Sequence, residues 1–234
     1  MRTLAYTAGS PFARAVRIVL DELDLEYEKR EETGTPSAEE RAAATPTLQV
    51  PAFRDGDFTL WESGLIVEYL LSTYRHRPAT DPPLAKHAFR PEAEWQDKLV
   101  FSTIQTFGNA ATTISQLKWA GVGIAGNAHL TRSAEKLAHI LRWLEERLSE
   151  AGLGFIPDCT SMQDIFLAAH IRFVAARPIG IDLDIKRYRH IFRLLEALDR
   201  RPSFNANPIW WWEPGVVGYL QDGTPLYEKG RQDG

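Results

Sequence analysis

The stretch from Tyr6 to Leu20, "YTAGSPFARAVRIVL", decides the fold, because it joins a predicted strand to a predicted helix. Gly9 ends a short apolar run that begins at Thr3. Ser10 followed by Pro11 is a preferred helix opening, since a serine hydroxyl can accept a first-turn N–H and proline suits the first helical position. Beyond them, apolar residues recur at helical spacing: Ala15, Val16, Val19, Leu20 and Leu23. The stretch therefore predicts a strand, a tight junction and a helix.

In the rest of residues 1–76, the spacing of the apolar residues changes several times between the helical and the strand period. This is typical of an α/β unit. A second strand is expected over residues 25–30, and a short helix is possible between Pro36 and Pro46. Two strands are predicted around Asp55-Gly56, a dipeptide suited to a hairpin turn. A helix should cover the following segment, with one apolar face made of Leu65, Ile66, Tyr69, Leu70 and Tyr74. The predicted order is βαβ followed by ββα.

Residues 77–90 are proline-rich and are expected to form a linker. Residues 91–234 should form an all-helical domain, with helices near residues 92–120, 128–150, 161–176 and 184–200. Ser161 and Asp164 fit a capping box, in which Asp164 would be a buried cap. The aromatic-rich tail contains the Trp210–Trp212 run, for which a core contact, a dimer contact and a wall of a substrate pocket stay open. The expected fold class is thus α/β plus all-α.

Composition limits the partners. The 234 residues carry a formal net charge of −4, which argues against a nucleic-acid partner. No apolar run is long enough to span a membrane, and the first residues do not resemble a signal peptide. The single cysteine, Cys159, allows no internal disulfide and fits a reducing cytoplasm. The histidines and the cysteine show no metal-site spacing, so no metal is expected.

Four segments together resemble the cytosolic glutathione transferase superfamily: "SPFARAVRIVL", "QVPAF", "WESGLIVEYL" and "SMQDIFLAA". The resemblance extends to about residue 202. It implies a thioredoxin-like N-terminal domain, a helical C-terminal domain, glutathione as co-substrate and a homodimer.

The resemblance also implies how glutathione would be held. Val50-Pro51 matches a pair with a cis peptide bond, whose backbone would bind the cysteinyl part like an added strand. Glu62 and Ser63 would bind the γ-glutamyl end at a helix N-terminus, and Gln49 would contact the glycyl carboxylate. From the residues alone, a trans proline, a simple serine cap and an exposed glutamine are open alternatives.

Ser10 matches the position from which the family acts on the glutathione sulfur. The segment "SPFA" is similar to omega-like members, which have cysteine where this chain has serine, so mixed-disulfide chemistry is not expected. A serine hydroxyl can instead donate to the thiolate and lower the thiol pKa from its usual value of about 8.5. Tyr6 is the competing residue for this role. A purely structural cap is the other reading of Ser10, and Phe12 would pack beside the sulfur or in the core.

The expected function is a detoxifying glutathione transferase that directs the thiol to a hydrophobic electrophilic small molecule. Conjugation is favoured, and peroxide reduction, dehalogenation, ether cleavage and isomerisation use the same thiolate. Phe107, Thr112 and Trp119 are expected in an apolar acceptor pocket. Neither Arg14 nor Arg17 is expected to bind ligand, and for Arg17 the resemblance implies packing or an ion pair. The alternative function is a non-catalytic binding or interaction module of the same fold.

Overall fold

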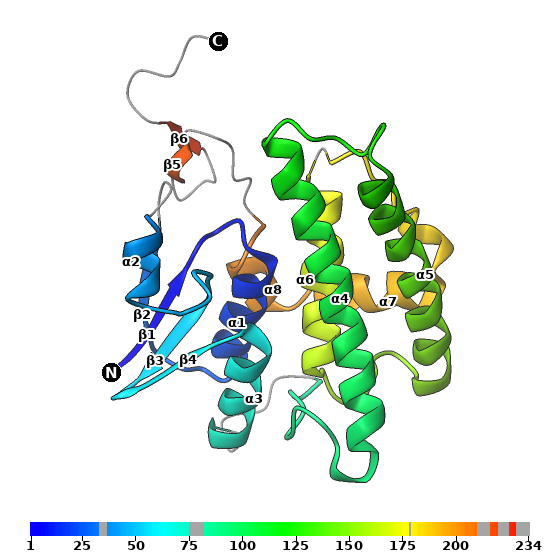
Figure 1. The fold of residues 1–234 in the computed structure, drawn as a ribbon. Helices are drawn as coiled ribbons and strands as arrows, with labels where there is room; N and C mark the ends of the chain where they lie inside the picture. The colour runs from blue at the N-terminus through cyan, green and yellow to red at the C-terminus, as the bar shows by residue number, and fades with distance from the viewer. Residues whose placement is uncertain (33–36, 75–81, 178, 210–215, 220–224, 228–234) are drawn as a thin grey trace.

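The computed structural model describes residues 1–32, 37–74, 82–177, 179–209, 216–219 and 225–227 (Figure 1). It contains the predicted four-stranded sheet and a group of long helices beside it. Residues 77–81 of the predicted linker and the Trp210–Trp212 run lie outside the described residues. The fold class predicted from the sequence, a thioredoxin-like α/β unit followed by helices, is confirmed.

The sheet consists of β1 (Arg2–Tyr6), β2 (Glu28–Glu31), β3 (Ala52–Asp55) and β4 (Phe58–Trp61), in the order β2-β1-β3-β4. The β1–β2 pair is parallel, and the other two pairs are antiparallel. Gly56 has a φ of 61° in the predicted hairpin turn, a conformation that glycine adopts without steric cost. The second strand begins at Glu28, later than predicted, because Asp24 turns the chain with a φ of 48° and Leu25 is buried before the strand.

Two helices, α1 (Pro11–Glu22) and α3 (Ser63–Tyr74), lie between the sheet and the helical domain (Figure 1). The predicted apolar face of α3 is partly wrong. Leu65 is 54% exposed, whereas the buried residues are Ser63, Ile66, Val67, Leu70 and Leu71. Because α3 is apolar on nearly all sides, its periodicity does not reveal which side packs against α1. The short α2 (Ala38–Ala42) has a capping box between Ser37 and Glu40.

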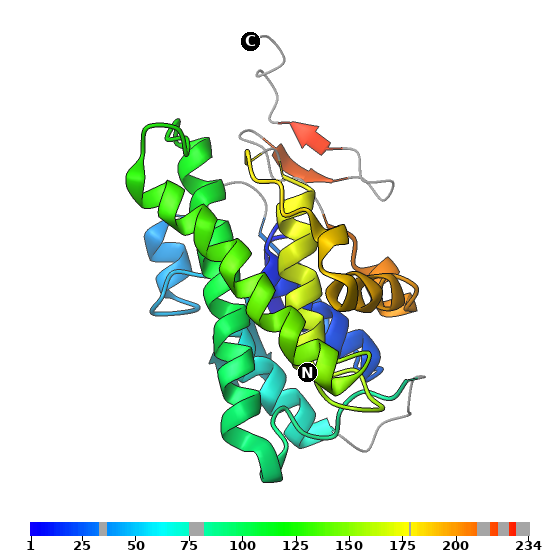
Figure 2. The same cartoon turned by 90° about the vertical axis from the view of Figure 1, so that its right-hand side faces the viewer.

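The helical domain contains η1 (Pro91–Ala93), α4 (Glu94–Trp119), α5 (Ala128–Ala151), α6 (Met162–Ala175), η2 (Ile185–Arg187), α7 (Arg189–Leu198) and α8 (Pro202–Ala206). Figure 2 shows α6 between α4 and α7, and α6 is also one of the helices against which α1 packs. The helix predicted over residues 184–200 is divided, because Asp184 has a φ of 43° and an α-helix starts only at Arg189. The short strands β5 (Val216–Tyr219) and β6 (Pro225–Tyr227) pair beyond α8, so this part of the predicted all-helical domain is not helical.

The predicted capping box at the start of α6 is present. Ser161 Oγ accepts the Asp164 N–H, and the Asp164 carboxylate accepts the Ser161 N–H at 2.8 Å. The carboxylate also accepts hydrogen bonds from the Ser161 hydroxyl at 2.7 Å and from the Phe155 N–H at 3.0 Å. Burial raises the pKa of Asp164 to about 6, although these donors oppose the shift. Asp164 therefore anchors the most buried helix.

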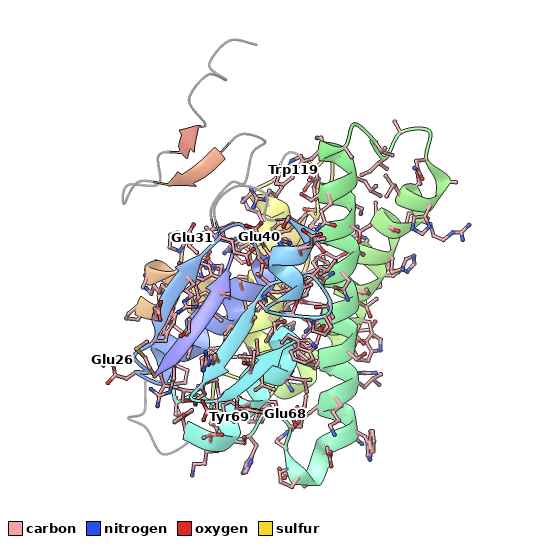
Figure 3. The ribbon with its side chains drawn as sticks, turned by 60° about the vertical axis from the view of Figure 1, so that its left-hand side comes forward. Glu26, Glu31, Glu40, Glu68, Tyr69 and Trp119 are labelled. Carbon is pink, nitrogen blue, oxygen red and sulfur yellow. The ribbon has the colours of Figure 1, made fainter. Side chains whose placement is uncertain are left out.

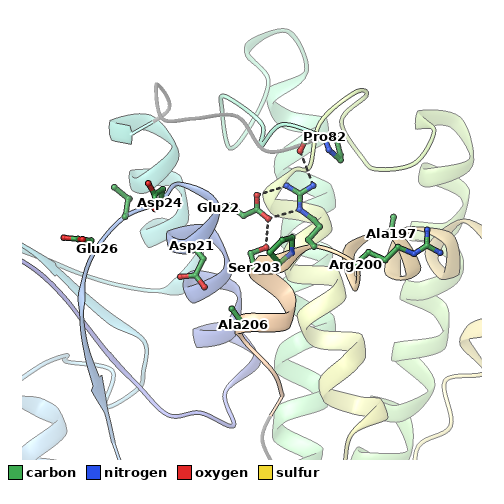
Figure 4. Close-up of a pocket in the computed structure, with 12 residues that line it drawn as sticks. Asp21, Glu22, Asp24, Glu26, Pro82, Ala197, Arg200, Ser203 and Ala206 are labelled. Atoms are coloured by element: carbon green, nitrogen blue, oxygen red, sulfur yellow. Dashed lines mark hydrogen bonds and ion pairs between the residues drawn. The ribbon is translucent and has the colours of Figure 1, made fainter. Parts of the chain in front are cut away.

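A buried ion pair fastens the two parts of the chain together. Arg201 donates to both carboxylate oxygens of Glu22 in α1, at 2.7 and 2.6 Å, and to the Pro82 carbonyl at 3.1 Å. Ser203 Oγ also donates to Glu22. The pair borders a cavity of about 630 Å³ between α1, α7 and α8 (Figure 4). Both charges are nearly excluded from solvent, so the ion pair compensates part of the cost of burying them.

We predict that Arg201→Met destabilises the fold by about 3–5 kcal/mol, because it removes the guanidinium that donates to both oxygens of the buried Glu22 carboxylate. The double variant Arg201→Met/Glu22→Gln should recover part of this loss. Urea unfolding measures both. Arg30→Met is the control, since the Arg30–Glu28 pair is exposed and its removal should change little. If Arg201→Met and Arg30→Met lowered the free energy of unfolding by similar amounts, this account would be contradicted.

Candidate active site

Two adjoining cavities lie between the N-terminal unit and α4. The small cavity has a volume of about 220 Å³. It is lined by Phe12, Thr47, Gln49, Val50, Pro51, Glu62, Ser63, Gln105 and Asn109. The large cavity has a volume of about 780 Å³ and includes Ser10. The two share Phe12, Gln49, Val50 and Asn109. All seven residues predicted from the sequence as site residues therefore border this pair of cavities.

Ser10 is the N-cap of α1, with extended backbone angles of −79° and 121°. Its Oγ accepts the Ala13 N–H at 3.2 Å, and Pro11 occupies the first helical position. The cap uses a lone pair of the hydroxyl, so the O–H proton is not consumed by it and can be donated into the large cavity. The partial positive charge of the helix N-terminus acts at the same place.

Tyr6, the competing residue, lines neither cavity. Its side chain is buried, its hydroxyl donates to Glu31 at 3.4 Å, and the Arg17 guanidinium lies 4.8 Å from its ring centre. Burial, followed by the nearby Glu31 carboxylate, raises the pKa of Tyr6 above its usual value. These contacts direct the hydroxyl away from the site and favour Ser10 over Tyr6.

The Val50–Pro51 peptide bond is cis, as predicted, and the trans alternative is wrong. The loop before it is held by Thr45, whose hydroxyl donates to the Gln49 carbonyl at 3.2 Å and accepts the Gln49 N–H at 3.3 Å. Leu48 has a left-handed φ of 57° in the same loop. Gln49 is exposed at the rim of both cavities. The Thr45 contacts thus fix the backbone that borders the cavities at Val50.

Glu62 and Ser63 form the start of α3. Glu62 has a φ of 66°, an unfavourable conformation for a residue with a side chain, and its carbonyl accepts the Ile66 N–H at 3.0 Å. Ser63 is buried and begins the helix. First-turn N–H groups lack helical partners and attract carboxylates, while the Glu62 carboxylate attracts cations. The small cavity therefore offers complementary charges to a zwitterionic group.

Sequence reasoning found only part of the contribution that α4 makes to the site. Gln105 and Asn109 line the small cavity, and Asn109, Thr112 and Gln116 line the large one. Their spacing of four, three and four residues places them on one stripe of the helix. Thr112 and Trp119 border the large cavity as expected, and Figure 3 shows Trp119 near the C-terminal end of α4. Phe107 is wrong as a pocket residue, because it is fully buried on another side of α4 and lines neither cavity.

A buried histidine supports this wall from behind. His170 Nε2 donates to Gln105 Oε1 at 3.2 Å, and the ring packs against Phe12 with centres 4.7 Å apart. Gly108 is required here, because a Cβ at that position would lie 2.4 Å from His170 Cε1. Burial lowers the pKa of His170 to about 3, so the ring is neutral near pH 7. In the sequence, the sign of this close approach between α4 and His170 is that position 108, inside a predicted helix, is a glycine.

The remaining candidates lie away from the cavities. Arg14 donates to the Asn207 carbonyl at 2.7 Å, and Arg17 packs on the Tyr6 ring, which is one of the two roles expected of Arg17. Burial raises the pKa of the Cys159 thiol to about 11, and Cys159 borders neither cavity. Among the described residues, no cluster of three histidine, cysteine or acidic side chains could hold a metal ion. No helix in the described ranges is long and apolar enough to cross a membrane.

His170 should make stability fall as the pH drops below about 6.5. The unfolded chain then binds a proton at this residue that the folded protein, with its lowered pKa, does not bind. Between pH 7.5 and pH 5, we expect wild type to lose about 2 kcal/mol more than His170→Phe does. Urea unfolding at the two pH values measures this difference. His139→Phe, at an exposed position, should keep the wild-type dependence. If the free energy of unfolding changed equally with pH in His170→Phe and wild type, the role given to His170 would be contradicted.

Comparisons with known proteins agree with this geometry. Residues 4–78 match the family model described as the glutathione S-transferase N-terminal domain. A probable glutathione S-transferase of Oryza sativa subsp. japonica is 30% identical over 205 residues, covering 84% of this chain and 90% of that protein.

Solved structures show the same fold. A glutathione S-transferase from Methylobacillus flagellatus with GSH bound gives a TM-score of 0.72 at 20% identity and covers 88% of this chain and 98% of that one. A glutathione S-transferase from Methylobacterium radiotolerans in complex with glutathione sulfonate gives a TM-score of 0.72 at 22% identity. The match covers 94% of this chain and 96% of that one. On the length and identity of the match to the rice protein, this chain belongs to the glutathione S-transferase family.

Proposed function

We propose that this protein is a serine-type glutathione transferase, in which Ser10 activates the glutathione thiol for conjugation to an electrophilic small molecule. The observation that carries the proposal is the position of Ser10. Its capping hydroxyl borders the large cavity, and that cavity shares a wall with the small cavity formed by Val50, Glu62 and Ser63.

In this proposal the small cavity binds most of the tripeptide. The α3 N-terminus at Ser63 holds the γ-glutamyl carboxylate, and the Glu62 carboxylate faces the ammonium group. The Val50 backbone pairs with the cysteinyl part, and Gln49 reaches the glycyl carboxylate from the rim. Phe12, which borders both cavities and is supported by His170, packs beside the sulfur.

Ser10 would act by stabilising an anion, without itself becoming the nucleophile. Its O–H donates to the glutathione sulfur, and the α1 N-terminus adds a favourable field, so the thiol loses its proton to solvent more easily. Each unit by which the thiol pKa falls corresponds to about 1.36 kcal/mol of preferential binding of the thiolate. The thiolate then forms a bond to the electrophilic carbon, and the leaving group departs with its bonding electrons. No general base on the protein is required.

Ser10→Ala should reduce kcat/KM for conjugation by about 10²-fold, the usual effect of removing one donor to a developing anion. Glutathione binding should change little, because the groups at Glu62, Ser63 and Val50 remain. Turnover of 1-chloro-2,4-dinitrobenzene and calorimetry with glutathione measure the two quantities. Ser72→Ala is a matched control, since the Ser72 hydroxyl lies on the far part of α3 and donates to the Tyr69 carbonyl.

Three outcomes would contradict the proposal. Unchanged turnover in Ser10→Ala would remove Ser10 from the reaction. Absence of glutathione binding at millimolar concentration would exclude a glutathione-dependent enzyme. Binding of glutathione with no turnover of any of a panel of electrophiles would favour the non-catalytic binding module.

We further propose that the protein is a homodimer that works in the cytoplasm, where glutathione is kept reduced. Three large apolar side chains are exposed on neighbouring helices: Leu65 on α3 at 54%, and Trp95 and Leu99 on α4 at 77% and 59%. Gly64, next to Leu65, approaches the Phe101 ring of α4, which places this part of α3 beside α4. Large apolar side chains exposed on helices that lie side by side are typical of a protein–protein contact.

The double variant Leu65→Asp/Trp95→Asp should therefore be monomeric at concentrations where wild type is dimeric, because charged groups at the centre of an apolar contact oppose association. Sedimentation velocity at micromolar concentration measures the mass. Val122→Asp is the control, because Val122 is 38% exposed but lies after the C-terminal end of α4, whereas Trp95 lies at its N-terminal end. A monomeric wild type, or a double variant that stays dimeric, would contradict the proposed dimer.

A further inference from the structure

We infer that His170 is a positioning residue for the tripeptide. It holds the Gln105 amide so that the N–H groups of the amide, and not its oxygen, face the γ-glutamyl carboxylate in the small cavity. The inference rests on the proposed function, because it takes the small cavity to be the glutathione site. It adds a contact from the helical domain to a carboxylate that the N-terminal unit would otherwise bind alone.

Gln105 reaches the small cavity from α4 and lies beside the first turn of α3. It is half-buried and lines the cavity together with Glu62 and Ser63. A Cβ at Gly64, the second residue of α3, would lie 3.4 Å from Gln105 Nε2. The N–H groups of this turn lack helical partners and attract a carboxylate. A carboxylate bound there would therefore lie next to the Gln105 amide.

The orientation of the Gln105 amide decides whether it attracts or repels that carboxylate. An amide carries two N–H donors on one side and a carbonyl oxygen on the other, and only the N–H groups favour an anion. The oxygen is already engaged, because Gln105 Oε1 lies 3.2 Å from His170 Nε2. Among the described residues, Gln105 Nε2 has no hydrogen-bond partner, so its N–H groups remain for a ligand in the small cavity.

The surroundings of His170 decide which ring nitrogen carries the proton. Burial lowers the pKa of His170 to about 3, so near pH 7 the ring carries one proton. The ring packs on Phe12 and Phe166, with centres 4.7 and 6.0 Å away, and lies against Gly108. Its Nδ1 is buried and has no partner among the described residues. A buried N–H without an acceptor is rarer than a buried acceptor without a donor. The proton is therefore on Nε2, where Gln105 Oε1 accepts it.

Two peptides that differ only in one carboxylate test the contact. S-methylglutathione has the γ-glutamyl carboxylate, and the S-methyl derivative of 4-aminobutyryl-cysteinylglycine lacks it. Because the sulfur is methylated in both, their binding does not depend on activation of a thiol. We expect Gln105→Leu to weaken the binding of S-methylglutathione by roughly 10- to 100-fold, the typical effect of removing a hydrogen bond to a charged group. The affinity for the second peptide should change little. Calorimetry measures both affinities.

His170→Phe tests the positioning role. Phenylalanine can keep the ring packing, but it leaves the Gln105 amide free to turn, so the affinity for S-methylglutathione should fall by less than in Gln105→Leu. In a Gln105→Leu background, the same substitution should have little effect, whereas a merely structural role would weaken binding in both backgrounds. Gln96→Leu is the control, because Gln96 is an exposed amide of α4 that lines neither cavity. Nitrogen NMR of the wild-type imidazole should show the proton on Nε2.

The affinities separate this inference from the proposed function. If wild type turns over no electrophile but the affinities change as expected, the proposed reaction fails and the inference is supported. Four results would overturn the inference: no binding of S-methylglutathione to wild type, equal losses for the two peptides in Gln105→Leu, a loss in His170→Phe that persists in the Gln105→Leu background, or a proton on His170 Nδ1.

Discussion

The hydrogen bond from the Ala13 N–H to Ser10 Oγ is the interaction on which the site depends. It fixes where α1 begins, and α1 is the helix that packs against both α3 and α6. A start shifted by one residue would rotate the apolar residues of α1 by about 100° away from these contacts. The burial of α1 therefore holds the Ser10 hydroxyl at the edge of the cavity. A structural cap and a donor to a thiolate are compatible roles, because the cap uses a lone pair and the donor uses the proton.

The two parts of the chain meet along α1, and both contribute to the site. The N-terminal unit supplies backbone groups and helix N-termini, which suit the charges and the extended form of a tripeptide. The helical domain supplies one stripe of α4 and Arg177 after α6, which line the large cavity. His170 connects the two parts of the chain, because its ring contacts Phe12 of α1 and Gln105 of α4. The Glu22–Arg201 pair fixes the same interface at the other end of α1.

The sequence predicted those features that depend on neighbouring residues. The Ser10-Pro11 cap, the Asp55-Gly56 turn and the Ser161–Asp164 capping box each need only a few adjacent positions, and all are present. The cis Val50–Pro51 bond was predicted through the resemblance to a family.

Features that depend on distant contacts were missed or were wrong. The buried side of α3 could not be read from a helix that is apolar all round, so Leu65 was misplaced. Gln105 and Arg177 enter the site only because α4 and α6 fold back over α1, and no local pattern distinguishes them from surface residues.

The central claim is that the protein lowers the pKa of the glutathione thiol at Ser10. Titration of the ultraviolet absorbance of the thiolate, with glutathione bound to the wild-type enzyme, tests this most directly. The account predicts a midpoint at least one pH unit below the value of about 8.5 for a free thiol. A midpoint at or above that value would show that the thiolate is not stabilised and would contradict the account.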